Sequence, residues 1–348
     1  MKILRTPEER FADLPDYPFA PRYHDVAPGM RLHYVDEGPR AAKPVLMLHG
    51  EPTWSYLYRH MIPPVAAAGL RVLAPDLIGF GKSDKPAEKS DYTYEGQVAW
   101  IRHWLEALDL RDITLVCQDW GSLIGLRLVA ECPERFARVL LGNGGLPTEA
   151  LKISPAFRIW RAFSRRSPWF PIGRIVQGGT RRRLSAGERG AYDAPFPDER
   201  HKAGARIFPS LVPTSGFNPR GSADNERAWQ VLEQWHKPFV TCYSDGDPIT
   251  RGLDGEFVRR VPGAKGQPHC TLSGGHFMQE DDSARFARLI VDCCRTQNQG
   301  AGEPANPPEE SSELARLLLK RAWCAADYPT ERAAETRRVT EAQLQRNL

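Results

Sequence analysis

The sequence predicts an α/β fold, in which helices flank a mostly parallel β-sheet and an inserted helical region interrupts it. Continuous apolar runs such as residues 44–48 are typical of strands buried on both faces of a parallel sheet, and they alternate with segments of helical spacing. From about residue 144 to residue 216 no clear strand pattern occurs, and residues 237–243 then resume the sheet. This alternation predicts right-handed crossover connections between parallel strands.

Composition excludes several classes of protein. The chain has 348 residues, of which 41% are hydrophobic, and it contains no apolar run long enough to predict a membrane span. Residues 1–10 do not resemble a signal peptide. A net charge of +4 is too small to predict nucleic-acid binding. The seven cysteines show no zinc spacing, so we expect no metal, reduced thiols and a cytoplasmic location. We also expect a monomer that uses no cofactor.

The first strands lead to a glycine-containing turn. Residues 31–38 alternate like a strand, and residues 44–48 and 71–76 are continuous apolar runs. The run at 44–48 ends in His-Gly-Glu-Pro, where a glycine allows backbone N–H groups to point at a ligand, as an oxyanion hole requires. An ordinary strand-to-helix turn is the alternative. The glycine loop at 79–84 lacks the Walker spacing, so we predict no nucleotide site there.

The sequence around Asp119 predicts a nucleophile elbow. A helical pattern between Tyr94 and Leu108 leads into a β-branched strand, residues 113–116, and a second helical pattern follows at 123–130. The small residues that such a tight turn needs stand two positions on either side of Asp119 (Cys117 and Gly121). A carboxylate at the tip can attack carbon and form an ester on its own side chain. The alternative is that Asp119 caps the following helix.

Two later strands supply the partners of this nucleophile. The strand at 237–243 is followed by Asp245 and Asp247, and the strand at 269–272 is followed by Gly-Gly-His276. Nucleophile, acid and histidine then occur in the chain order of α/β-hydrolases. The strand at 138–143 ends at an uncharged asparagine, so the acid must come from the strand after the inserted region. We assign Asp247 as this acid and expect Asp245 to hold the turn.

At these residues the sequence resembles the haloalkane dehalogenases, and in particular the subfamily whose acid follows the strand after the cap. The resemblance covers residues 6–295 and implies an α/β-hydrolase fold. The sequence pattern divides the chain into core residues 1–143 and 217–296 and a helical cap at 144–216. The family likeness does not extend to residues 297–348, which are a linker and tail by composition and are expected to contribute nothing to catalysis. The matching stretches are residues 49–58 (HGEPTWSYLY), 79–86 (GFGKSDKP), 118–121 (QDWG), 194–198 (APFPD) and 275–277 (GHF).

The resemblance implies a reaction and a role for each site residue. Asp119 would displace halide from an alkyl carbon, and His276, oriented by Asp247, would activate the water that hydrolyses the ester to a primary alcohol. A halogenated alkane and water are thus the implied substrates, and halide is a product. The backbone N–H groups of Glu51 and Trp120 would stabilise the oxyanion of the hydrolysis step.

The same resemblance implies that two indole N–H groups bind the leaving halide. Trp120 supplies one, and a cap tryptophan supplies the other. We choose Trp160, which lies in the family's cap motif at 156–161 (AFRIWR), over Trp169, which lies in a Ser-Pro-Trp-Phe-Pro loop. Phe157 and Leu123 are expected to line the substrate pocket.

Three other functions compete with dehalogenation. An epoxide hydrolase shares the aspartate elbow but uses two cap tyrosines, and the predicted cap contains only Tyr192. An ordinary esterase would need a serine at the tip of the elbow, whereas Ser122 lies past it, on the predicted helix. A binding protein that has lost its triad does not fit, because all three triad positions are filled. The many arginines of the cap are expected to form a solvated face.

Overall fold

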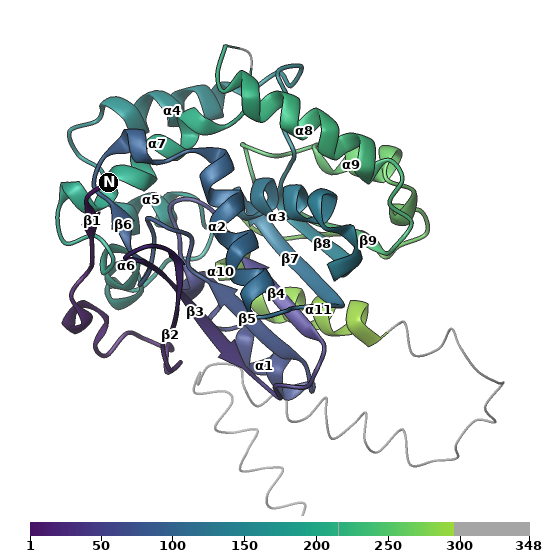
Figure 1. The fold of residues 1–348 in the computed structure, drawn as a ribbon, viewed down its shortest axis with the longest axis horizontal. Coiled ribbons are helices and arrows are strands. Elements are labelled where there is room, and N and C mark those ends of the chain that lie inside the picture. The colour runs from purple at the N-terminus through teal and green to yellow at the C-terminus, as the bar shows by residue number, and fades with distance from the viewer. Residues whose placement is uncertain (215, 296–348) are drawn as a thin grey trace, which may run out of the picture. The chain divides into compact units, whose positions relative to one another are not determined.

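The computed structural model describes residues 1–214 and 216–295, so the predicted linker and tail lie outside the described residues. An eight-stranded sheet has the order β10-β9-β8-β7-β4-β5-β3-β2 (Figure 1). A separate pair, β1 (Ile3–Leu4) and β6 (Lys85–Pro86), is antiparallel. The strands of the large sheet are β2 (Arg22–Ala27), β3 (Met30–Glu37), β4 (Pro44–Leu48), β5 (Arg71–Pro75), β7 (Ile113–Asp119), β8 (Phe136–Gly144), β9 (Phe239–Ser244) and β10 (Cys270–Leu272).

The prediction of a mostly parallel sheet is confirmed. The pairs from β5 through β4, β7, β8 and β9 to β10 are all parallel, whereas β3 pairs antiparallel with both β2 and β5. β4 is buried along its whole length, which is the reason for its unbroken apolar sequence. The edge strand β2 was not predicted from sequence, because it is half-exposed and carries charged residues among its few apolar ones.

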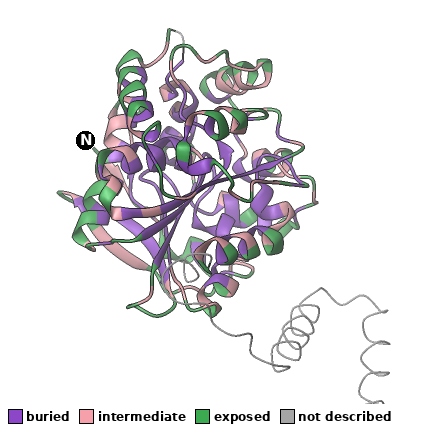
Figure 2. Cartoon of the chain, turned by 90° about the vertical axis from the view of Figure 1, so that its right-hand side faces the viewer, coloured by how far each residue is buried: buried purple, intermediate pink, exposed green. Residues whose placement is uncertain are grey.

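Helices cover both faces of this sheet. α2 (Tyr94–Ala107) and α3 (Trp120–Glu131) pack together, α3 contacts β7 and β8, and Thr93 caps α2 by accepting a hydrogen bond from the backbone N–H of Gly96. α1 (Ile62–Ala67) packs with α11 (Ser283–Arg295) against the opposite face. Two further helices, α9 (Asp254–Arg260) and α10 (Met278–Asp281), follow β9 and β10. Buried residues follow the strands, and exposed residues follow the outer faces of the helices (Figure 2).

Helices replace strands between β8 and β9. α4 packs on α7, and α5 packs on α6, whereas α8 packs on α3 beside the sheet. Figure 1 shows α4, α7 and α8 above the sheet. None of the helices in the described part of the chain is long and apolar enough to cross a membrane. The helices of this region are α4 (Pro155–Arg166), α5 (Ile172–Gly178), α6 (Ala186–Asp193), α7 (Ala203–Leu211) and α8 (Pro219–Leu232).

A buried ionic cluster ties α6 to the core. The fully buried guanidinium of Arg59 donates hydrogen bonds to Glu188 of α6 at 2.9 Å and to Glu280 of α10 at 2.5 Å. Arg182 also pairs with both carboxylates. The expectation that the cap arginines form a solvated face is therefore wrong for Arg182. Together with Arg59, it balances the charges of one glutamate nearby in sequence and one that is distant.

Candidate active site

Asp119 lies at a strained turn between β7 and α3. Its φ of 51° and ψ of −126° are unusual for a residue that is not glycine. The turn is tight enough that a Cβ atom on Gly121 would clash with the carbonyl of Leu48, and one on Gly50 would clash with the Asp119 side chain. Asp119 occupies the N-cap position of α3, but its side chain makes no capping hydrogen bond. The local geometry is thus that of a nucleophile elbow rather than of a capping aspartate.

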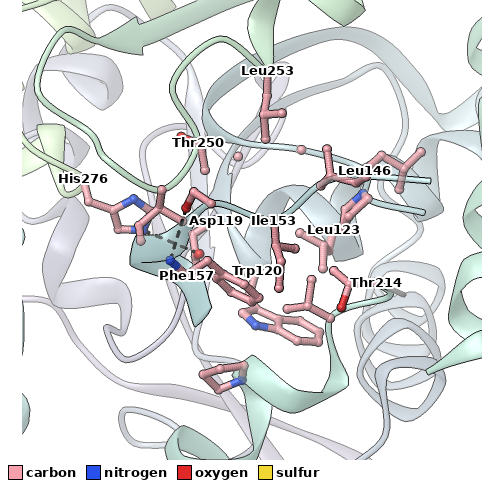
Figure 3. A pocket seen from close by; sticks show the side chains of 18 of the residues that line it. Asp119, Trp120, Leu123, Leu146, Ile153, Phe157, Thr214, Thr250, Leu253 and His276 are labelled. Atoms are coloured by element: carbon pink, nitrogen blue, oxygen red, sulfur yellow. Dashed lines mark hydrogen bonds and ion pairs between the residues drawn. The ribbon is translucent and has the colours of Figure 1, made fainter. Parts of the chain in front are cut away.

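The ends of β9 and β10 bring an acid and a histidine to this turn. Nδ1 of His276 lies 3.0 Å from Oδ2 of Asp247, and Nε2 lies 3.5 Å from Oδ2 of Asp119. Asp247 is buried and accepts further hydrogen bonds from the backbone N–H groups of Ile249 at 2.8 Å and Thr250 at 3.2 Å. The structure therefore brings the three residues selected from sequence together, with the imidazole of His276 between the two carboxylates. Figure 3 shows His276 beside Asp119.

Two other polar residues at the ends of strands, Asp245 and Asn143, do not pair with the imidazole of His276. Asp245 is half-exposed, pairs with Arg181 at 2.9 Å, and accepts a hydrogen bond from the backbone N–H of Gly274. Asn143 donates to the carbonyls of Gly275 and His276, so it supports the histidine loop and not the imidazole ring. Asp247 is the carboxylate that the structure places beside Nδ1 of the imidazole.

The two carboxylates determine the protonation of His276. Burial lowers the pKa of His276, but the negative charges of Asp247 and Asp119 raise it to about 10. Burial alone would raise the pKa of Asp247, yet His276 and the donors from Thr250 and Ile249 hold it well below its usual value. In the resting site, the two carboxylates therefore favour the protonated form of the imidazole.

Glu51 contributes its side chain to the site as well as its backbone N–H. Its N–H donates to Oδ1 of Asp119 at 2.7 Å. Its buried side chain lines the same cavity. Burial and the charge of Asp119 raise the pKa of Glu51 well above its usual value. His276 and a hydrogen bond from Trp160 lower that pKa, but by less. This shift favours the neutral form of the Glu51 side chain beside Asp119. Sequence reasoning placed the Glu51 N–H beside Asp119 but missed the side chain, because its burial depends on contacts between distant segments.

The loop that carries His276 is held by residues that sequence reasoning also missed. The side-chain amide of Gln118 lies 3.1 Å from Nε2 of His276. Asp281 accepts hydrogen bonds from the backbone N–H of Gly275 at 2.7 Å and from those of Arg181 and Arg182. Gln118 precedes the nucleophile directly, which is the one sequence signal that could have indicated its place.

Asp119 and His276 line a cavity of about 570 Å³. Its lining is mostly apolar, and Figure 3 shows Leu123, Leu146, Ile153, Phe157 and Leu253 around it. A cavity of this size and lining suits a small organic molecule. Within the part of the chain that the structure describes, no group of three or more His, Cys, Asp or Glu side chains could hold a metal ion.

The structure separates the two candidate cap tryptophans. Trp160 lines the cavity together with Trp120, and its ring packs on Phe170 and Phe163. Trp169 is 58% exposed and is not part of the cavity wall. Tyr192 is buried against Glu280, and the described wall of the cavity contains no tyrosine, so the pair of phenols that an epoxide hydrolase would need is not present there.

The Ser122 hydroxyl is also engaged elsewhere. It donates to the carbonyls of Asp119 and Gly145, at 2.5 and 3.1 Å, and it is fully buried. A serine held in this way below the elbow is not placed to attack a substrate. Fold, elbow and cavity together define an α/β-hydrolase that carries an aspartate at the tip of its elbow.

Comparison with known proteins gives the same class and a more specific family. Residues 43–170 match the family model for the alpha/beta hydrolase fold. A haloalkane dehalogenase of Psychrobacter cryohalolentis is 55% identical over 84% of this chain and 97% of its own length. Haloalkane dehalogenase 1 of Mycobacterium tuberculosis is 54% identical over 84% of this chain and 98% of its own length. The chain belongs to the haloalkane dehalogenase family.

A solved structure supports the same assignment. The haloalkane dehalogenase DpaA from Paraglaciecola agarilytica superposes with a TM-score of 0.77 at 34% identity, over 84% of this chain and 97% of that one. The protein is accordingly a hydrolase acting on carbon–halide bonds, with a haloalkane and water as substrates. An epoxide hydrolase, the strongest rival, is not favoured.

Proposed function

We propose that Asp119, His276 and Asp247 carry out hydrolytic dehalogenation in two chemical steps. The observation that carries this proposal is the chain of contacts from Asp247 through His276 to Asp119 at the end of an apolar cavity. In the first step Oδ2 of Asp119, the oxygen that does not accept the Glu51 N–H, attacks the halogenated carbon in line. The carbon–halogen bond breaks, and an alkyl ester forms on Asp119.

Ester formation prepares the second step. Once Asp119 is esterified, its charge is lost, and with it one of the two charges that raise the pKa of His276. The pKa of His276 therefore falls, and the imidazole can lose a proton and act as a general base on water. Water attacks the ester carbonyl carbon, while Asp247 stabilises the imidazolium that re-forms.

Two backbone donors are suited to the oxyanion of that second step. The Glu51 N–H already binds Oδ1 of Asp119, the atom that becomes the carbonyl oxygen of the ester. Trp120 begins α3, and the first N–H groups of a helix have no partner within the helix. We infer that the N–H of Trp120 is the second donor to this oxygen.

The halide site is proposed to consist of the indole N–H groups of Trp120 and Trp160. We expect Trp160→Phe, which keeps an aromatic ring and removes one donor to a charge, to weaken bromide binding by about 1.5–3 kcal/mol, or roughly tenfold to 150-fold. Bromide quenching of tryptophan fluorescence measures this affinity. Trp169→Phe is the matched control, because that exposed ring lies outside the cavity wall. Equal affinities for Trp160→Phe and the unchanged protein would remove Trp160 from the site.

The activity is tested by halide release. The protein should release bromide from 1-bromobutane and 1,2-dibromoethane with formation of the corresponding alcohol, and it should leave styrene oxide unchanged. The structural basis is a wall that includes Trp120 and Trp160 and, among the described residues, no tyrosine to activate an epoxide oxygen. Diol formation from styrene oxide without bromide release would contradict the proposal.

The division of the chain into parts supports the same function. We propose that residues 144–216 form a cap over core residues 1–143 and 217–296, since α4 carries Phe157 and Trp160 to the cavity. We further propose a monomeric, cytoplasmic protein. The Paraglaciecola agarilytica dehalogenase is described as tetrameric, so light scattering on this protein is the relevant measurement.

A further inference from the structure

A pair of thiols lies outside the catalytic site. Cys242 of β9 and Cys270 of β10 are direct partners in the parallel register of the two strands. Their sulfur atoms are 3.1 Å apart, and both cysteines are free thiols. Side chains of paired residues on neighbouring strands project from the same face of a sheet. The two sulfurs therefore face each other with no side chain between them.

The backbone spacing at this pair suits a disulfide. Neighbouring strands lie about 4.8 Å apart, and the Cα atoms of bonded cysteines are usually about 4.4–6.8 Å apart. Cys242 and Cys270 could thus be joined without separating or re-registering β9 and β10. The bond would connect the two strands whose ends carry Asp247 and His276.

The two thiols differ in exposure and reactivity. Cys242 is fully buried, whereas Cys270 is partly exposed. The hydrogen bond between Cys270 and Cys242 lowers the pKa of Cys270, and the positive charge of Arg285 acts in the same direction against burial and the charge of Asp282. Burial raises the pKa of the other described thiols instead, as at Cys117, Cys132, Cys293 and Cys294. A thiolate that solvent can reach is the form that reacts with oxidants.

We propose that Cys242 and Cys270 form a reversible, peroxide-sensitive disulfide site in which Cys270 reacts first. The Cys270 sulfur attacks one oxygen of hydrogen peroxide, so that an S–O bond forms, the O–O bond breaks, and water leaves after taking up a proton. The sulfur is oxidised to a sulfenic acid, and the peroxide is reduced. Cys242 then attacks this sulfur, the S–O bond breaks, and the departing hydroxide takes the Cys242 proton as a second water.

Peptide mapping of the full-length protein tests this proposal. Trypsin should release Cys242 in the peptide 228–251 and Cys270 in the peptide 266–285. The first peptide stays whole because trypsin does not cleave after Lys237, which precedes a proline. After reduction, treatment with hydrogen peroxide and blocking of the remaining thiols, we expect two thiols to be lost per chain. The two peptides should appear joined and should separate on addition of dithiothreitol.

Variants assign the order of events. Cys242→Ala should stop at the sulfenic acid on Cys270, which dimedone traps, whereas Cys270→Ala should consume peroxide-reactive thiol at least about tenfold more slowly. Cys293→Ala is the matched control, since it removes a neighbouring thiol of α11 and should leave the 228–251 and 266–285 peptides joined. Retained dehalogenase activity shows that each variant is folded.

Two results would overturn the proposal. One is that the peptides 228–251 and 266–285 of the wild-type protein stay separate although peroxide has oxidised other thiols. The other is a cross-link from Cys270 to Cys293 in place of Cys242. Neither result bears on dehalogenation, because the mapping measures thiols and not halide release.

Discussion

His276→Gln is expected to release about one halide per active site in a rapid burst and then to stall. Displacement by Asp119 transfers no proton, so it does not need the imidazole as a base. Hydrolysis of the ester does need one, because water is a poor nucleophile until a general base activates it. The stalled protein should carry the alkyl group of the substrate on Asp119, as a mass increase on the peptide that spans the elbow.

An exposed histidine provides the control for this experiment. His103 lies on the outer side of α2, so His103→Gln makes the same chemical change away from the site and should turn over normally. If His276→Gln binds halide but shows neither burst nor adduct, then the imidazole is needed during displacement, and the assignment of the two steps to separate residues is wrong.

Asp247→Asn is expected to slow ester hydrolysis by about 10⁴-fold, the loss seen when the equivalent acid of a serine protease triad is neutralised. The asparagine keeps the size of the side chain but loses the charge that holds Nδ1 of His276 at 3.0 Å and stabilises its protonated form. Rapid-quench measurement of alcohol formation after the halide burst isolates this step.

Asp245→Asn is the matched control for the acid. Asp245 precedes the same turn, but it is half-exposed and pairs with Arg181. Pairs of this kind contribute little to stability, so its replacement should leave the hydrolysis rate within about a few-fold of the unchanged protein. A larger loss in Asp245→Asn than in Asp247→Asn would mean that the acid has been assigned to the wrong residue.

The strands were the most predictable part of this fold. A strand buried on both faces must be apolar at every position, and β4 lies at the residues predicted from its apolar run. The elbow was equally predictable, because the steric demand at Asp119 appears directly in the sequence as Cys117 and Gly121. The edge strand β2 could not be predicted in the same way, since its outer residues face solvent and carry no periodic apolar signal.

The environment of the site was less predictable than its residues. Asp119, Asp247 and His276 follow strands of a parallel sheet, so their meeting at one edge of the sheet follows from topology. The raised pKa of Glu51 and the placement of Gln118 and Asp281 around His276 depend on contacts between distant segments. No local pattern encodes such contacts, and the same holds for the pairing of Arg182 with Glu280.

A single turnover in ¹⁸O-labelled water, with enzyme in excess over substrate, tests the covalent role of Asp119 most directly. If Asp119 forms the ester, water attacks the carbonyl carbon of the enzyme, and the label should appear in the Asp119 carboxylate on the elbow peptide. The alcohol should then carry an unlabelled oxygen that came from Asp119. Label found in the alcohol after one turnover, with an unlabelled Asp119, would show that water attacks the substrate carbon directly and would contradict the account.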